Sequence, residues 1–197
     1  MIMTVIACGD SAKGWIPRGT TIGSNDCEKF GNPVDYLVLA NAPRKFTPER
    51  MKVITKSKAQ VLTTSLSQWK PFFPSAEKIP KVTTFNKMIM KGYCQTSVTT
   101  PIMCLSLAIR MGATEIIMYG CDMLTHKTWR KGTKGGDQEI TKYLRYFKEM
   151  NRIGVKLWLG VKGTAFDGVV PVYADLTDQE LQWGINAVEK YEAKVSK

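Results

Sequence analysis

Several short stretches of the sequence carry side chains suited to binding a polar, anionic molecule. These stretches are Gly9-Asp10-Ser11, Asn25, Asn41, Thr99-Thr100 and Gly120-Cys121-Asp122. Amides and hydroxyls both donate and accept hydrogen bonds, and a carboxylate can hold a ribose hydroxyl or a base amine. A glycine-containing turn and a helix start offer free backbone N–H groups to a phosphate. The same residue types also serve as ordinary helix caps and turn residues, so each one alone leaves both roles open.

The elements that must position these residues alternate along the chain. Apolar and β-branched runs predict strands at 4–8, 20–24, 35–40, 60–64, 82–85, 115–119 and 155–161. Helical spacing and caps predict helices at 48–55, from Pro101 to about Gly112, at 137–153 and at about 176–195. Prolines make 69–79 irregular. This alternation predicts an α/β fold in which one domain over 1–197 has a mostly parallel sheet flanked by helices.

Parallel strands carry their polar ends to one edge of the sheet, where open α/β proteins bind ligands. The strand-end residues named above therefore predict a single binding crevice. Thr99 and Thr100, at the start of the central helix, could face the same ligand.

A basic, glycine-rich segment follows Asp122. We predict that about 123–136 forms a lid-like loop over the site, because this segment lacks hydrophobic periodicity. It contains Lys127, Arg130, Lys131 and Lys134. These cations can close over phosphates, or they can form a solvated basic loop. His126, the only histidine, is a candidate general base or an exposed loop residue, and Asp137 is a second candidate base or a helix cap.

The composition narrows the class of protein and its partners. The net charge of +11 makes an anionic partner plausible, whether nucleotide, glycan, lipid surface or nucleic acid. Five cysteines without paired spacing and one histidine leave too few ligands for a zinc site, and we expect no metal. No run approaches the length of a membrane span. We expect a cytoplasmic protein with reduced thiols.

The strand-end residues resemble those of bacterial sialyltransferases, which build terminal sialic acid on surface glycans. Their order and approximate spacing match that family over roughly residues 1–165, and Ala7-Cys8-Gly9-Asp10-Ser11 is similar to its first-strand loop. The resemblance implies a Rossmann-like, single-domain glycosyltransferase that uses a nucleotide-sugar donor, with a CMP-sugar as the first choice. It implies nucleotide contacts from Gly9, Asp10, Ser11, Asn25, Asn41, Thr99, Thr100, Gly120 and Asp122.

The catalytic residues follow less directly from the resemblance. His126 would deprotonate an acceptor hydroxyl beside Asp122, with no cofactor other than the donor. The family's catalytic histidine, however, lies near the start of the helix that corresponds to 137–153. Cys8 replaces a loop asparagine of the family, and Met123 and Leu124 replace aromatic residues that help to hold the donor phosphate. Whether the chain is catalytically competent therefore stays open.

Two other functions are compatible with the same residues. The first is a non-catalytic nucleotide or nucleic-acid binding protein on the same fold, which the high positive charge favours. The second is phosphoryl or pyrophosphoryl transfer, because the glycine loop and strand-end carboxylate also look similar to those of pterin pyrophosphokinase-like proteins. In that case Asp10 and Asp122 would hold Mg²⁺.

Overall fold

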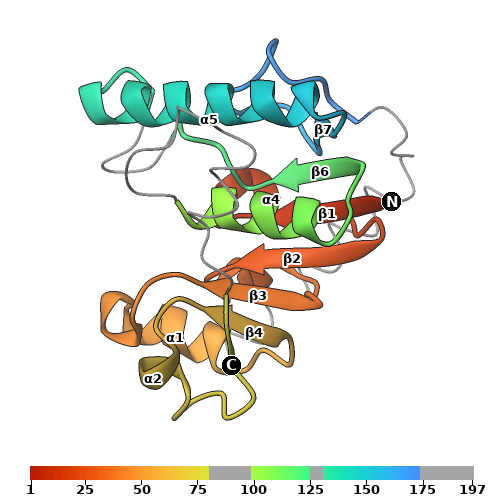
Figure 1. Cartoon of the computed structure of the whole chain (residues 1–197). Coiled ribbons are helices and arrows are strands. Elements are labelled where there is room, and N and C mark those ends of the chain that lie inside the picture. Colours follow the sequence, from red (N-terminus) through yellow and green to blue (C-terminus); the bar gives the residue numbers. More distant parts are fainter. Residues whose placement is uncertain (80–98, 125–130, 174–197) are drawn as a thin grey trace.

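The computed structural model describes residues 1–79, 99–124 and 131–173, and its strands form one parallel sheet (Figure 1). The strands are β1 (Ile2–Ile6), β2 (Thr20–Ser24), β3 (Tyr36–Leu39), β4 (Gln60–Thr63), β5 (Glu77–Lys78), β6 (Glu115–Tyr119) and β7 (Lys156–Leu159). Their order is β5-β4-β3-β2-β1-β6-β7, and every neighbouring pair is parallel. The predicted α/β fold with a parallel sheet is confirmed.

The strand order changes direction beside β1. The chain runs outward from β1 to β5 on one side, and then returns to place β6 on the other side of β1. Ile6 pairs with Gly23 of β2 and with Tyr119 of β6, so the carboxyl ends of these three strands are level. Such a reversal point leaves a crevice between diverging connections, and it is where open α/β sheets bind ligands.

Helices cover both faces of the sheet. The helices are α1 (Pro48–Ile54), α2 (Leu66–Trp69), α4 (Thr100–Arg110) and α5 (Lys134–Arg152). Alternate strand residues face opposite ways: Ile116 packs in a core with α4 and α5, whereas Ile117 packs in a second core with α1 and α2. In Figure 1, α4 crosses in front of β1 and α5 runs beside β6 and β7. This three-layer arrangement fixes the helix starts relative to the strand ends.

Several predicted boundaries differ from the structure. The strand predicted at 4–8 is β1, which begins at Ile2. The segment 69–79 is not wholly irregular, because Glu77–Lys78 forms the short edge strand β5. The helix predicted at 137–153 begins at Lys134, so the end of the predicted loop 123–136 is helical. The cause is Thr133, whose hydroxyl accepts the N–H of Gly136 and caps the helix four residues before Asp137, the other cap candidate.

Other expectations lie outside the described residues. They are the strand at 82–85, the helix at about 176–195 and most of the predicted lid-like loop. Within the described ranges, the helices all lack the combination of length and apolar content that a membrane crossing requires.

Candidate functional site

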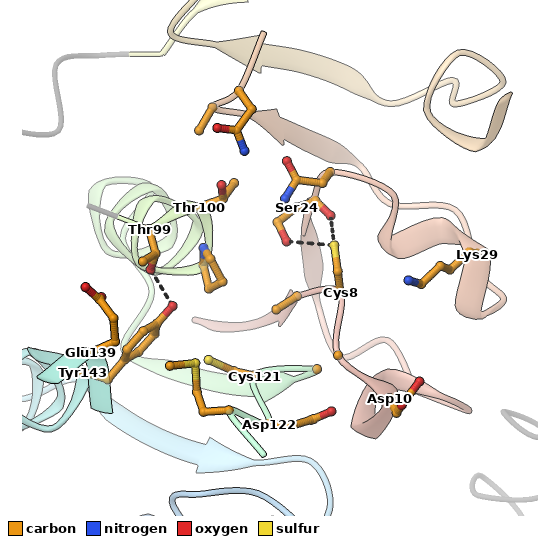
Figure 2. A pocket seen from close by; sticks show the side chains of 18 of the residues that line it. Cys8, Asp10, Ser24, Lys29, Thr99, Thr100, Cys121, Asp122, Glu139 and Tyr143 are labelled. Atoms are coloured by element: carbon orange, nitrogen blue, oxygen red, sulfur yellow. Dashed lines mark hydrogen bonds between the residues drawn. The ribbon is translucent and has the colours of Figure 1, made fainter. Parts of the chain in front are cut away.

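A cavity of about 680 Å³ lies at the carboxyl edge of the sheet, beside the reversal point (Figure 2). Its lining includes eight of the nine predicted nucleotide contacts, namely Gly9, Asp10, Asn25, Asn41, Thr99, Thr100, Gly120 and Asp122. Its size falls within the roughly 300–1,000 Å³ of small-molecule sites. The structure thus brings residues from four separate strand ends and one helix start into a single crevice.

Asp122 ties the glycine loop to the end of β6. It accepts the backbone N–H of Ser11 at Oδ2 over 3.0 Å and the Ser11 hydroxyl at Oδ1. The Ser11 hydroxyl in turn accepts the N–H of Gly120 at 3.1 Å. Both oxygens of this buried carboxylate therefore bind within the protein. This arrangement makes Asp122 a positioning residue for the loop. Ser11, the ninth predicted contact, binds Asp122 and is not part of the cavity lining.

Two glycines allow this close approach of β1 and β6. A Cβ on Gly9 would lie 2.5 Å from Asp122 Oδ2 and from the carbonyl oxygen of Gly120. Gly120 has a φ of +71°, and a Cβ there would lie 2.5 Å from the carbonyl oxygen of Ala7. Since no side chain fits at either position, the glycine loop and the end of β6 pack backbone against backbone, and the N–H of Gly9 donates to the carbonyl oxygen of Gly120 at 2.8 Å.

The two predicted amides lie on the β2 and β3 side of the cavity. Asn25 directly follows β2 with a φ of +52°, a conformation that asparagine tolerates better than most residues, and its N–H donates to Val38 at 3.1 Å. Its buried Oδ1 has no hydrogen-bond partner among the described residues. Asn41 lies beyond the end of β3, with its carbonyl oxygen accepting the indole N–H of Trp69 and its side chain exposed. Both amides are thus available to a ligand.

The start of α4 forms another wall. Thr99 occupies the N-cap position but makes no side-chain capping bond, because its hydroxyl lies 2.5 Å from the hydroxyl of Tyr143 on α5. Thr99, Thr100 and Pro101 all line the cavity. The uncapped first turn offers backbone N–H groups and the positive end of the helix dipole, which favour a negatively charged group.

A cationic wall that was not predicted lies next to Cys8. Asp26 is 1% exposed and binds both Arg50, at 2.5 Å from Nη2, and Lys29, at 3.3 Å from Nζ. Burial alone would raise the pKa of the Asp26 carboxyl, but hydrogen bonding from Arg50 and the two positive charges lower it below 3.8. Arg50 and Lys29 both line the cavity. Burial, then the charge of Asp26, raises the pKa of the Cys8 thiol to about 11, so this thiol is neutral at pH 7.

The opposite wall carries a buried carboxylate. Figure 2 shows Glu139 and Tyr143 of α5 on one side of the cavity and Cys8 and Lys29 on the other. Glu139 is 4% exposed, and its Oε1 pairs with Lys142 at 2.5 Å. Its Oε2 is buried and has no hydrogen-bond partner among the described residues. A buried carboxylate oxygen without a donor is costly, and a hydroxyl of a bound ligand would satisfy it.

The predicted loop residues do not gather around the cavity in the described part of the chain. Lys131 and Lys134 are exposed and lie outside the cavity lining, and His126, Lys127 and Arg130 fall outside the described residues. The N–H of Lys131 donates to Met123 at 2.7 Å, so the two ends of this segment meet. Asp137 accepts the N–H of Gly132 at 2.8 Å, which gives it a structural role at the helix start.

The Mg²⁺ ligands of the phosphotransfer hypothesis do not form a ligand cluster. Asp10 has a side chain that is 68% exposed and lies 4.0 Å from Lys13, while Asp122 is bound to Ser11. Among the described residues, no group of three or more acidic, histidine or cysteine side chains has the arrangement of a metal site.

Sequence reasoning missed Lys29, Arg50 and Glu139. In the sequence, Arg50 is an ordinary residue near the start of the helix predicted at 48–55, and Lys29 belongs to a short 3-10 helix, Cys27–Phe30, without hydrophobic periodicity. Glu139 did carry a signal. It lies four residues before Tyr143 and is on the same apolar face of the predicted helix, where a charged residue needs a partner or a function.

Comparison with known proteins adds information about the fold. No protein-family model matches the chain, and neither does any curated protein. Among solved structures, the sialyltransferase CstII from Campylobacter jejuni in complex with CMP-3FNeuAc is similar, with a TM-score of 0.59 at 12% identity over 87% of this chain and 85% of that one. CST-II in complex with a trisaccharide acceptor and CMP gives 0.59 at 13% identity, over 87% and 86%.

A third structure extends the likeness along the chain. The α-2,3-sialyltransferase from Campylobacter jejuni in apo form has a TM-score of 0.51 at 16% identity and covers 96% of this chain and 95% of its own. None of these three proteins is a pterin pyrophosphokinase. Identities this low establish a shared fold and leave function to the site. The predicted Rossmann-like fold, of the kind found in sialyltransferases, is thereby confirmed.

Proposed function

We propose that this chain is a glycosyltransferase that takes a nucleotide-activated sugar, with a CMP-sugar as the first choice, and transfers the sugar to a hydroxyl of a glycan. The observation that carries the proposal is the convergence of Asn25, Asn41 and the Thr99-Thr100 helix start with the glycine loop around one cavity. Amides and threonine hydroxyls suit a pyrimidine edge and a ribose, and the N–H groups at the start of α4 suit a phosphate. The solved neighbours with CMP in their complexes support this choice of donor.

Transfer to a hydroxyl requires a proton acceptor. Glu139 Oε2 is the best placed described group for this role, because it lines the cavity and lacks a donor. The acceptor proton would pass to this oxygen as the acceptor oxygen bonds to the anomeric carbon of the sugar. The bond between that carbon and the phosphate oxygen breaks, and its electron pair leaves with the phosphate. His126 remains a candidate for the same role from its place in the sequence, and Lys127 and Arg130 remain candidates for stabilising the departing phosphate.

A ligand-dependent melting experiment tests the proposal. CMP should raise the melting temperature more than UMP, GMP or AMP, and it should do so without Mg²⁺. Asn25→Gly removes the amide while accommodating the φ of +52°, and should weaken the CMP-dependent shift. Lys56→Ala, at an exposed position outside the cavity lining, is the control and should leave it unchanged. The absence of a shift with every nucleotide and nucleotide sugar would contradict the proposal.

A further inference from the structure

The cationic wall of the cavity, formed by Lys29 and Arg50 around Asp26, has more positive than negative charges. One buried carboxylate holds two cations, through bonds from Arg50 Nε at 3.0 Å and Nη2 at 2.5 Å and an ion pair with Lys29 at 3.3 Å. The group therefore retains one positive charge. Next to it, the neutral Cys8 thiol contributes no negative charge and donates to the carbonyl oxygen of Ser24 at 3.0 Å.

The two cations are also held in place from a second side. The Arg50 guanidinium carbon lies 4.8 Å from the centre of the Phe46 ring, and Lys29 Nζ lies 4.6 Å from the centre of the Phe30 ring. Long cationic side chains lose rotational freedom when they bind an anion. Because Asp26 and the rings already restrict Lys29 and Arg50, part of this cost is met before a ligand arrives.

The acidic groups that line the cavity lie elsewhere. Asp122 binds Ser11 on the β1 and β6 side, Asp10 is near Lys13, and Glu139 is on α5 across the cavity from Lys29 (Figure 2). The cavity thus has a cationic wall, and the wall across from it carries the Glu139 carboxylate. A ligand with an anionic group at one end and hydroxyls at the other would match both walls.

We propose that Lys29 and Arg50 form an oxyanion subsite, positioned by Asp26, which takes a phosphate or carboxylate group of the ligand. The inference deepens the proposed function and rests on it for the identity of the ligand, since a CMP-sugar offers a phosphate and an acidic sugar offers a carboxylate. Arg50 binds Asp26 through Nε and Nη2, which leaves the Nη1 hydrogens and the second Nη2 hydrogen for an oxyanion, and Lys29 provides a point charge.

Binding measurements on single variants test the subsite. Lys29→Gln removes one cation and leaves the pair between Arg50 and Asp26 intact. Arg50→Lys keeps a positive charge beside Asp26 but removes the planar guanidinium group. Lys56→Gln is the matched control at an exposed position outside the cavity lining. Titration calorimetry with CMP, cytidine, N-acetylneuraminate and neutral N-acetylmannosamine separates the phosphate from the carboxylate as the bound group.

If the subsite takes phosphate, Lys29→Gln should weaken CMP binding about tenfold and leave cytidine binding unchanged. If it takes carboxylate, the same loss should appear with N-acetylneuraminate and be absent with N-acetylmannosamine. Equal affinities in wild type and both variants for every probe would overturn the subsite while leaving the proposed function in place. A wild-type protein that binds neither CMP nor N-acetylneuraminate would overturn both.

Discussion

Ser11 donates both its backbone N–H and its hydroxyl to the carboxylate of Asp122, which joins the first loop of the chain to the end of a strand more than a hundred residues later. The bond from the backbone is 3.0 Å long, and the same hydroxyl accepts from Gly120. This pair joins the residues that follow β1 and β6 at the point where the strand order reverses. The glycine loop therefore depends on Asp122 for its position.

Ser11→Ala should lower the free energy of unfolding by about 1–3 kcal/mol. The alanine leaves Asp122 without one donor and the N–H of Gly120 without its acceptor, and unmet buried groups cost this much. Urea unfolding at pH 7 measures the loss. Ser67→Ala, at an exposed site on α2, should change stability by less than about 0.5 kcal/mol. Similar values for the two variants would show that the pair contributes little.

Gly9→Ala should abolish CMP binding. The new methyl group would lie 2.5 Å from Asp122 Oδ2 and from the Gly120 carbonyl oxygen, so the loop must move away from the cavity. Gly163→Ala is a useful comparison, because Gly163 has a φ of +91° but open space around its Cβ position. That variant should cost about 1–2 kcal/mol of stability and retain binding. Calorimetric titration with CMP distinguishes them, and full binding by Gly9→Ala would disprove the steric argument.

Glu139→Gln should lower the rate of donor hydrolysis or sugar transfer by about 10²-fold or more, with CMP affinity retained. The amide keeps the shape of the side chain but cannot accept a proton from a hydroxyl. Release of CMP from CMP-N-acetylneuraminate measures the rate. Glu149→Gln on the same helix is the matched control, since Glu149 also pairs with a cation three residues later but lies outside the cavity lining. An unchanged rate in Glu139→Gln would exclude Glu139 as the base.

Asp26→Asn should lower the free energy of unfolding by about 3 kcal/mol at pH 7, because Lys29 and Arg50 lose their buried partner. Although burial opposes it, the pairing lowers the pKa of Asp26 below 3.8. A carboxyl with a lowered pKa contributes its full stabilisation above its unfolded pKa and loses it as the pH falls through the folded value.

The difference between wild type and Asp26→Asn should therefore be constant from pH 7 to about pH 5 and shrink at lower pH. Urea unfolding across this range measures it. Asp10→Asn, at a largely exposed carboxylate, should show a much smaller difference at every pH. A cost for Asp26→Asn that does not change with pH would contradict the assigned ion pairs.

The position of the crevice at the carboxyl edge of the sheet could be predicted, because the carboxyl ends of parallel strands lie at the same edge regardless of the connections between the strands. Asn25, Asn41 and Asp122 follow apolar runs, and this pattern alone placed them around one crevice. The cationic wall could not be predicted in this way. Arg50 reaches the cavity only because α1 packs beside the turn that carries Asp26, and this contact depends on tertiary packing.

The start of α5 and the strand β5 could not be predicted from local sequence either. Thr133 and Asp137 both have side chains that can cap a helix, and their local preferences do not decide between them. The structure uses Thr133 as the cap and Asp137 as an acceptor for Gly132. The strand Glu77–Lys78 is short and exposed, so it carries no alternating pattern. Its pairing with β4 became visible only in the folded sheet.

The position of β1 in the middle of the sheet has a consequence for biosynthesis. β1 is made first, yet one of its two partners, β6, is made after more than half of the chain. A nascent chain that ends before β6 has the ends of β1, β2 and β3 and the start of α4, but lacks Asp122 and all of α5. The crevice can therefore be completed only after β6 and α5 have been synthesised and have packed against β1, however early the first strands form.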